Sequence, residues 1–175
     1  MNRASDLIRS FKQVAVDQTS EEARKINLLD YVDEVLESLR PQLKSTKHNI
    51  LVEGTHDIVM DTHPGALSQI ITNLIMNSII HAYDEGDEGC IRIQVSKNGP
   101  SISIDYSDDG KGMSKEVSDK IFEPFFTTNR GSGGSGLGMH ILYNQVTQTL
   151  GGSINLESTP GEGTAFRITI PYEFH

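Results

Sequence analysis

Two asparagines occur inside a stretch that otherwise predicts an amphipathic helix. Residues 65–82 carry apolar side chains at helical spacing, and Asn73 and Asn77 lie within them, four residues apart. Asparagine is a poor interior helix residue because its amide competes with the backbone for hydrogen bonds. At this spacing both amides project on one side of the helix. They are either solvated or capping amides, or groups whose carbonyl oxygens bind a hard cation such as Mg²⁺ or order water in a pocket.

A carboxylate follows one of the predicted strands. Residues 102–106 alternate apolar and polar side chains, and Asp108 shares the parity of the apolar ones. Since a buried carboxylate without a partner is costly, Asp108 is either a turn residue just past the strand or an acceptor for a ligand's donors. Gly110 and Gly112 would then leave space for that ligand. Thr164 shares the inward parity of its own strand and could add a second polar contact.

A glycine-rich stretch at 131–138 leads into a helix expected at about 137–150. Free N–H groups and the positive end of the helix dipole favour phosphate at such a place. Three of its glycines match G-x-G-x-x-G, but no buried strand precedes them, so a dinucleotide-binding fold is not indicated. A P-loop would need lysine where Leu137 stands. The alternative interpretation is a flexible linker.

Composition excludes several classes of function. The 175-residue chain has a formal net charge of −9, so it is a poor candidate for binding the nucleic-acid backbone. A single cysteine, Cys90, excludes an intrachain disulfide framework and a cysteine-rich zinc site, and is consistent with a reducing, cytoplasmic compartment. No apolar run reaches the roughly 18–20 residues that span a bilayer. We therefore expect no membrane contact by this chain.

Helices and hairpins must position these groups. Asn27 and Asp30 resemble a helix capping box, and Asn98-Gly99 predicts a hairpin turn. Further helices are expected at 3–23, with a narrow apolar seam, at 65–82 and at 137–150. Strands are expected near 49–53, 57–61, 91–95, 102–106, 154–156 and 166–170. Helices and antiparallel hairpins without repeated βαβ units predict an α+β sandwich with helices on one face of the sheet.

Four motifs occur in a characteristic order. They are Asn73-Leu-Ile-Met-Asn77, Asp108-Asp-Gly-Lys-Gly112, Phe122-Glu-Pro-Phe-Phe-Thr-Thr128 and Gly134-Ser-Gly-Leu-Gly-Met139. Together they resemble the N box, the two glycine boxes and the F box of sensor histidine kinases. These kinases belong to the ATPase superfamily of gyrase, heat-shock chaperones and mismatch-repair proteins. The resemblance covers residues 26–171 and implies a Bergerat-type sandwich, a mixed, mostly antiparallel sheet with about three helices on one face.

The resemblance implies that ATP and Mg²⁺ bind, and it assigns the phosphate end of the site. Asn77 would give its oxygen to Mg²⁺, with Asn73 one turn earlier in the same pocket. The segment 127–136 would form a lid over the nucleotide, and Arg130, its one cation, would approach the γ-phosphate. Further nucleotide contacts are expected from Phe126, Thr127, Thr128, Gly134, Ser135, Gly136, Leu137, Gly138 and Met139.

The resemblance also assigns the adenine end. Asp108 would accept a hydrogen bond from the adenine amino group, and Thr164 would reach the base through water. The base would rest on Gly110 and Gly112, with Met113 against it and either His81 or Tyr83 stacked on it. One departure from the usual pattern is Ile80, which stands where a lysine is common.

The phosphoacceptor histidine of such kinases has no counterpart before residue 23. The seam of Leu7, Phe11 and Val14 resembles the end of the second helix of a dimerisation hairpin. The expected organisation is therefore a remnant of that hairpin and a linker at 1–24, and a catalytic ATP-binding domain at 25–175. Whether the parent protein is anchored in a membrane is left open.

The activity implied by the resemblance is transfer of the ATP γ-phosphoryl group to a histidine on a separate dimerisation domain. The partners would be that hairpin and, through the full kinase, a response-regulator receiver domain, and the isolated chain would be nearly inactive. The first alternative is an ATP-hydrolysing clamp, but such proteins carry a glutamate where Asn73 stands, and an amide has no useful basicity. The others are an anti-sigma Ser/Thr kinase and a degenerate nucleotide-binding scaffold.

Overall fold

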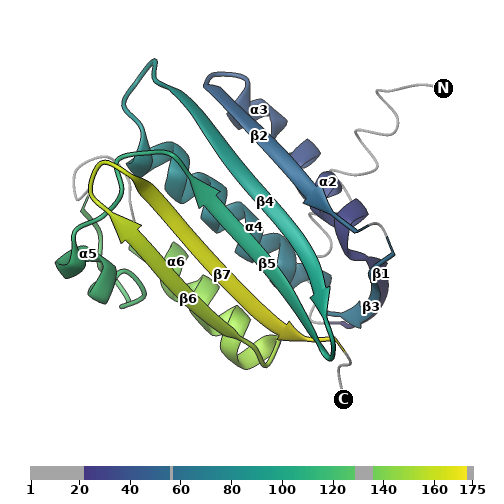
Figure 1. Ribbon diagram of the computed structural model, residues 1–175. Helices are drawn as coiled ribbons and strands as arrows, with labels where there is room; N and C mark the ends of the chain where they lie inside the picture. Colours follow the sequence, from purple (N-terminus) through teal and green to yellow (C-terminus); the bar gives the residue numbers. More distant parts are fainter. Residues whose placement is uncertain (1–21, 56, 129–135, 173–175) are drawn as a thin grey trace.

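A mixed five-stranded sheet forms one layer of the fold (Figure 1). The computed structural model describes residues 22–55, 57–128 and 136–172. The strands lie in the order β2-β4-β5-β7-β6, and only β2 and β4 run parallel. Their bounds are Lys47–Gly54 for β2, Glu88–Asn98 for β4, Ser101–Asp108 for β5, Gly163–Pro171 for β7 and Ser153–Thr159 for β6. The predicted mixed, mostly antiparallel sheet is confirmed.

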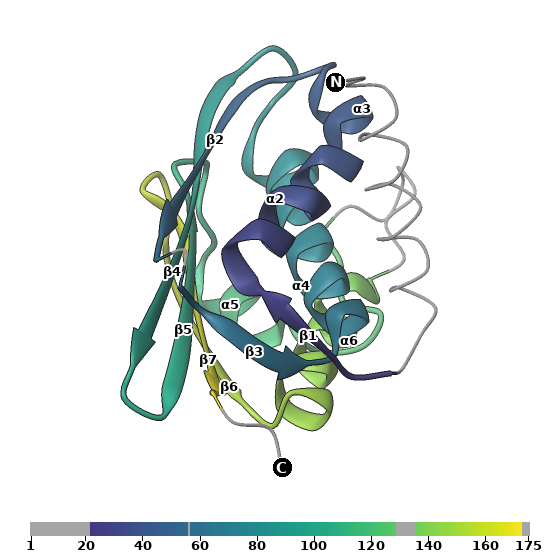
Figure 2. The same ribbon diagram turned by 90° about the vertical axis from the view of Figure 1, so that its right-hand side faces the viewer.

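The helices cover one face of this sheet, as Figure 2 shows for α2, α4 and α6. They are α2 (Leu28–Ser38), α3 (Arg40–Leu43), α4 (Pro64–Asn77), α5 (Lys115–Lys120) and α6 (Gly138–Asn144). Two of them continue as single π-helical turns, η1 (Ser78–Ala82) after α4 and η2 (Gln145–Thr149) after α6. Within the described ranges, no helix combines the length and apolarity that a bilayer span requires.

The helices predicted at 65–82 and 137–150 are thus confirmed over nearly their whole length. Each of them ends in a π-helical turn. Asn27 caps α2 as expected, because its Oδ1 accepts from the Asp30 N–H at 3.2 Å. The hairpin turn after Asn98 is also confirmed, and Gly99 adopts a φ of +60° there. The helix expected at 3–23 lies mostly outside the described residues.

A second, two-stranded sheet was not anticipated from the sequence. It pairs β1 (Arg24–Asn27) with β3 (Val59–Thr62), antiparallel. The strands expected at 49–53 and 57–61 do exist approximately, but they do not pair with each other: β2 joins the main sheet beside β4 and β3 joins β1. Since β1 begins at Arg24, this residue is part of the folded domain and not of a preceding linker.

The core lies between α4 and the inner face of the sheet. On the strands it comprises mainly Ile91, Ile93, Val95, Ile102, Ile104, Tyr106, Phe166, Ile168 and Ile170. Opposite them lie Leu67, Ile70, Ile71, Leu74 and Ile75 of α4, each at most 1% exposed. Burying one such side chain contributes about 1.5–3 kcal/mol, so this interface fixes α4 firmly across the sheet. The polar residues at the ends of α4 and β5 are positioned by it.

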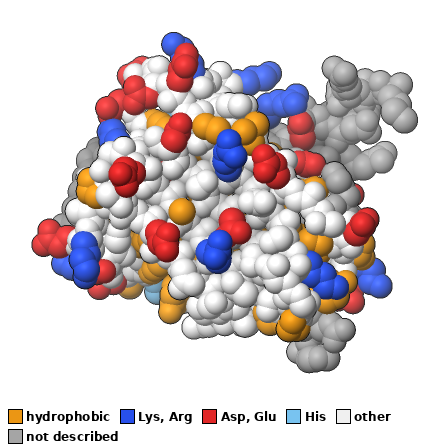
Figure 3. All heavy atoms as spheres, viewed as in Figure 1, with side chains coloured by type: hydrophobic (Ala, Val, Ile, Leu, Met, Phe, Trp, Pro, Cys, Tyr) orange, Lys and Arg blue, Asp and Glu red, His pale blue; other side chains and the backbone are white. Residues whose placement is uncertain are grey.

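The other face of the sheet is open. Figure 3 shows basic and acidic side chains scattered over this face, with small groups of hydrophobic side chains between them. Asp105 of β5 and Arg167 of β7 face each other there, and the Arg167 Nε donates to Asp105 Oδ1 at 2.7 Å. This hydrogen bond raises the pKa of Arg167. The cavity described next lies on the helix-covered side instead.

Candidate functional site

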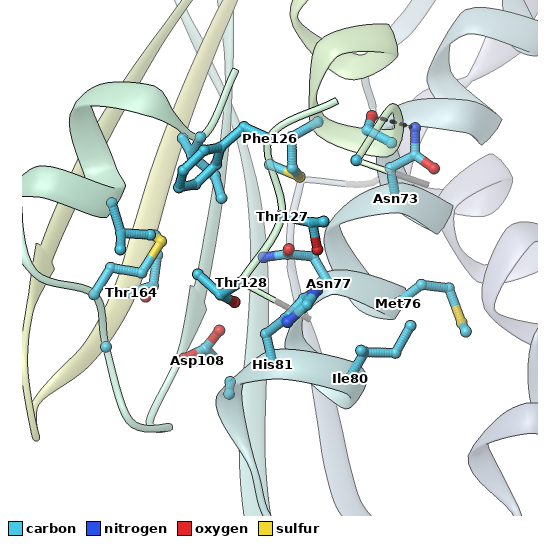
Figure 4. Close-up of a pocket in the computed structure, with 18 of the residues that line it drawn as sticks. Asn73, Met76, Asn77, Ile80, His81, Asp108, Phe126, Thr127, Thr128 and Thr164 are labelled. Carbon is cyan, nitrogen blue, oxygen red and sulfur yellow. Dashed lines mark hydrogen bonds between the residues drawn. The ribbon is translucent and has the colours of Figure 1, made fainter. Parts of the chain in front are cut away.

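A cavity of about 350 Å³ lies between the end of α4, the segment after β5 and the segment that enters α6 (Figure 4). It brings together thirteen of the residues predicted from the sequence. They are Asn73, Asn77, His81, Asp108, Gly112, Met113, Phe126, Thr127, Thr128, Gly136, Gly138, Met139 and Thr164. Arg130, Gly134 and Ser135 lie outside the described residues.

Asp108 closes one end of the cavity. It is the last residue of β5, only 7% exposed, and its side chain faces the cavity (Figure 4). Its Oδ2 accepts from the Ser78 hydroxyl at 2.6 Å, and its Oδ1 accepts from the Gly110 N–H at 3.1 Å. The inward orientation predicted from strand parity is confirmed, and the turn-residue alternative is wrong. A carboxylate has about four acceptor positions, so capacity for a ligand's donor is left.

Thr164 lies beside Asp108 in the register of β5 and β7. It is 6% exposed, and its hydroxyl lies 2.9 Å from that of Ser158. Ser158 also accepts from the Met113 N–H at 2.7 Å, which holds the loop after β5 against β6. Thr164 therefore adds a polar group to the wall near Asp108, as its inward parity predicted.

The two asparagines of α4 differ in what they contact. The Asn73 Nδ2 donates to the Gly138 carbonyl oxygen at 2.9 Å, the dashed line in Figure 4. Asn73 thus joins α4 to the first residue of α6. Asn77 also lines the cavity, and within the described part of the chain its amide has no hydrogen-bond partner. Asn77 is therefore the amide that is available to a ligand.

The charged groups of the cavity wall are few. Asp108 is the one carboxylate among its described lining residues, which include no lysine or arginine. The described residues also hold no group of three or more His, Cys, Asp or Glu side chains that could bind a metal. A hard cation in this cavity would need oxygen ligands from an amide, from water and from a bound molecule. That donor set suits Mg²⁺, which keeps waters and substrate phosphates.

Of the two rings expected to stack on a base, His81 lines the cavity and Tyr83 is absent from its described wall. Burial lowers the pKa of His81, so its imidazole is neutral at pH 7. The Tyr83 ring instead stacks on His48 at 4.3 Å between centroids, and its hydroxyl donates to Asp109 Oδ1 at 2.7 Å. The expectation that either ring could stack on a base is therefore corrected for Tyr83. The strand-like backbone at Tyr83, after the π-turn ends, directs its side chain away from the cavity.

Burial acts to raise the pKa of Asp109, but hydrogen bonds from the Cys90 N–H and the Tyr83 hydroxyl outweigh it and hold that pKa below its usual range. Burial likewise raises the pKa of Tyr83. Asp109 and Tyr83 therefore form a fixed pair beside the site, and this pair binds β4 to the end of β5.

The glycines after β5 have different roles. Gly112 lines the cavity with a φ of +69°, and a Cβ there would overlap the Thr159 carbonyl oxygen. Gly110 does not line the cavity: a Cβ there would lie 2.5 Å from the Ala82 side chain. Gly110 lets this loop pack on Ala82, which is itself part of the wall. Leu137 was also predicted as a contact and is absent from the described wall.

Six further residues in the wall were not predicted from the sequence. They are Met76, Ile80, Ala82, Ser114, Val117 and Ile121. Most are apolar, and they add hydrophobic surface to the cavity wall. Ile80 is 48% exposed, and its position, where the resemblance leads to the expectation of a lysine, was the signal that the sequence offered. Val117 belongs to α5, a six-residue helix too short for a clear period.

The cavity wall therefore combines the Asp108 acceptor, apolar side chains and the Asn77 amide, which has no hydrogen-bond partner among the described residues. This arrangement suits a flat heteroaromatic ring with a donor group that is joined to a cation-chelating anion. Such ligands bind in largely apolar clefts with a few fixed polar groups.

Comparison with known proteins agrees with this geometry. Residues 62–173 match the family described as histidine kinase-, DNA gyrase B-, and HSP90-like ATPase. Sensor histidine kinase ZraS of Escherichia coli K12 is 34% identical over 82% of this chain and 28% of its own length. Sensor histidine kinase RcsC of the same organism is 27% identical over 98% of this chain and 19% of its own. The chain thus spans less than a third of the curated relatives that it matches.

Among solved structures, the nucleotide-free catalytic domain of histidine kinase ThkA superposes with a TM-score of 0.76 at 26% identity. The match covers 87% of this chain and 97% of that domain. The structure of ThkA in complex with response regulator protein TrrA has a TM-score of 0.71 at 24% identity. The match covers 98% of this chain and 48% of that structure, and it shows that the two folds are similar.

Proposed function

Since this chain belongs to the histidine kinase-, DNA gyrase B- and HSP90-like ATPase family, we propose that it is the catalytic, ATP-binding domain of a sensor histidine kinase. In this proposal it transfers the γ-phosphoryl group of ATP to a histidine on a separate dimerisation domain. The observation that carries the proposal is one cavity lined both by the Asp108 carboxylate and by the Asn77 amide, which has no hydrogen-bond partner in the described part of the chain.

Asp108 would recognise the base. Its carboxylate accepts hydrogen bonds and cannot donate them, so it suits the 6-amino group of adenine. The neutral His81 ring and the Met113 side chain would contact the faces of the base, and Gly112 would lie beside it. Thr164 would bind the ring through water. These contacts orient the nucleotide so that its phosphates point toward Asn77 and Gly138.

Asn77 would hold Mg²⁺ through its amide oxygen. Mg²⁺, when bound, supplies neutralisation of the negative charge on the triphosphate. The backbone at Gly136 and Gly138 lines the same end of the cavity, and its N–H groups can donate to phosphate oxygens. Asn73 would keep this backbone in place through its bond to the Gly138 carbonyl. Arg130 and Ser135 are proposed to complete the phosphate contacts.

The chemistry itself would need little from this chain beyond position and charge. An imidazole nitrogen of the acceptor histidine attacks the γ-phosphorus, and the bond to the β–γ bridging oxygen breaks. ADP leaves with that electron pair. Among the described residues of the wall, the one acid is Asp108, which already binds Ser78 and Gly110, so no other carboxylate there could deprotonate a water. This favours transfer to a supplied nucleophile over hydrolysis.

The rest of the parent protein is also a proposal. Residues 1–23 would be the end of a dimerisation hairpin and a linker, and β1, which begins at Arg24, would start the catalytic domain. The partners of the full kinase would be its own hairpin and a response-regulator receiver domain.

The test is phosphorylation in trans. The chain is mixed with a purified sensor-kinase dimerisation hairpin and ATP labelled on the γ-phosphate. We expect a phosphoprotein that is labile in acid and stable in base, and no such product with Asn77→Ala. Rapid release of phosphate without the hairpin would instead support the hydrolase, and an acid-stable phosphoester on an added acceptor would support a Ser/Thr kinase.

A further inference from the structure

A chain of buried hydroxyl groups lies behind Asp108. The Ser78 Oγ is 2.6 Å from Asp108 Oδ2 and also 2.6 Å from the Tyr106 hydroxyl oxygen. The Tyr106 hydroxyl in turn lies 3.0 Å from the Leu74 carbonyl oxygen. Ser78 and Tyr106 are 1% and 2% exposed, and neither of them lines the cavity. Their hydrogen bonds reach the cavity wall through Asp108.

The direction of these hydrogen bonds follows from counting protons. The Ser78 hydroxyl donates its single proton to Asp108 Oδ2. The Ser78 oxygen must then accept from Tyr106, whose proton lies between two acceptors, Ser78 Oγ and the Leu74 carbonyl. Burial raises the pKa of Tyr106, which keeps that proton in place. The hydrogen bonds are therefore donated in one direction, from Tyr106 to Ser78 and from Ser78 to Asp108.

The fold explains why these groups meet. Ser78 is the first residue of the π-turn η1 and follows Asn77 directly, while Tyr106 precedes Asp108 by two residues on β5. The bond from Tyr106 to the Leu74 carbonyl also joins β5 to α4. On its other side, Asp108 Oδ1 is held by the Gly110 N–H. Both carboxylate oxygens therefore have a protein donor before any ligand arrives.

We propose that Ser78 and Tyr106 are positioning residues that set the selectivity of the site for the base. By fixing the Asp108 carboxylate as an oriented acceptor, they favour a purine with a 6-amino group over one with a 6-oxo group. This inference rests on the proposed function, because it takes Asp108 to be the group that reads the base. It assigns a role to two residues that do not touch the nucleotide.

The test compares two purine nucleotides that differ at ring position 6. The whole chain is titrated calorimetrically with ATP and with inosine triphosphate, in excess Mg²⁺, as wild type, Ser78→Ala and Tyr106→Phe. Matched controls remove hydroxyls elsewhere in the fold: Ser103→Ala on β5, and Tyr31→Phe, whose hydroxyl donates to the Pro64 carbonyl. Thermal unfolding of every variant reports whether it is folded.

We expect the wild type to prefer ATP. Ser78→Ala should reduce the ratio of the two affinities about tenfold, because it removes one hydrogen bond to a charged group that orients the acceptor. Tyr106→Phe should reduce it in the same direction by a smaller factor, and both controls should leave it unchanged. The ratio is informative because loosening of the whole fold weakens both nucleotides alike.

The outcomes separate the inference from its premise. A wild type that binds neither nucleotide overturns the proposed function, and this inference with it. A wild type that prefers ATP while both variants keep its ratio overturns the positioning role alone. Equal weakening of both nucleotides, with a lower melting temperature, would also overturn it, because that is the effect of a purely structural role. If Ser78→Ala does not fold, Tyr106→Phe decides.

Discussion

Replacing Asp108 by asparagine tests the base-recognition end of the site most sharply. The change keeps the shape of the side chain and removes its charge and one of its acceptor oxygens. Asp108 is 7% exposed, and its two oxygens accept from the Ser78 hydroxyl at 2.6 Å and the Gly110 N–H at 3.1 Å. An amide can satisfy only one of these donors with its oxygen. Its NH₂ group must face the other donor or the cavity.

The expected loss of affinity follows from these bonds. A hydrogen bond to a charged group is worth about 1.5–3 kcal/mol. Losing the carboxylate acceptor for the adenine amino group should therefore weaken ATP binding about 10- to 150-fold. Inosine triphosphate has an oxo group at the same ring position, which can accept from the new amide NH₂. Its affinity should fall little or rise, so the Asp108→Asn variant should lose or invert the preference for ATP.

The assay is calorimetric titration of both nucleotides with Mg²⁺ into wild type and Asp108→Asn. Asp105→Asn is the matched control, since Asp105 lies on the same strand and faces the open side, bonded to Arg167. That ion pair lies on the open face of the sheet, away from the cavity, so the control should keep both affinities. A folded Asp108→Asn variant with wild-type ATP affinity and an unchanged preference would refute the assignment of Asp108 to the base.

Two further predictions concern the walls of the site. Gly112→Ala should lower the free energy of unfolding by at least about 1–3 kcal/mol, because the residue has a φ of +69° and its new Cβ would overlap the Thr159 carbonyl oxygen. Gly161→Ala is its control in chemical denaturation: it shares a positive φ, +83°, but a Cβ there meets nothing within 4 Å, so equal losses would contradict the steric reasoning. For His81, burial lowers the pKa in the folded state. Just below the ordinary pKa of 6.5, the unfolded chain therefore binds a proton at this residue that the folded chain does not. The free energy of unfolding consequently falls as the pH falls through that range. His81→Asn should reduce the stability difference between pH 7.5 and pH 5.5, and a variant with the wild-type pH slope would rule out a buried neutral imidazole.

Local sequence patterns predicted a side chain's direction correctly where that direction depends only on the helix or strand to which the residue belongs. The parity of β5 placed Asp108 inward, and the helical spacing of Asn73 and Asn77 put both amides in one cavity. Asn27 capped its helix as its type predicts. In each case the determining interactions lie within a few residues along the chain.

The remaining features depend on contacts between distant segments. Local periodicity in the sequence does not predict which strands pair. The pairing of β1 with β3 and the parallel pairing of β2 with β4 therefore could not be predicted. The direction of Tyr83 was missed because it follows from how the π-turn ends. Ser78 was missed because a serine in a helix is unremarkable until Tyr106, 28 residues away, is brought against it.

The central claim is that one cavity binds a magnesium-chelated nucleotide between Asp108 and Asn77. The most direct measurement is calorimetric titration of ATP into the wild type and Asn77→Ala, each in excess Mg²⁺ and in excess chelator. The account predicts that Mg²⁺ strengthens ATP binding to the wild type and that Asn77→Ala loses this gain while keeping the binding measured in chelator. No ATP binding by the wild type, or the same gain from Mg²⁺ in both proteins, would contradict it.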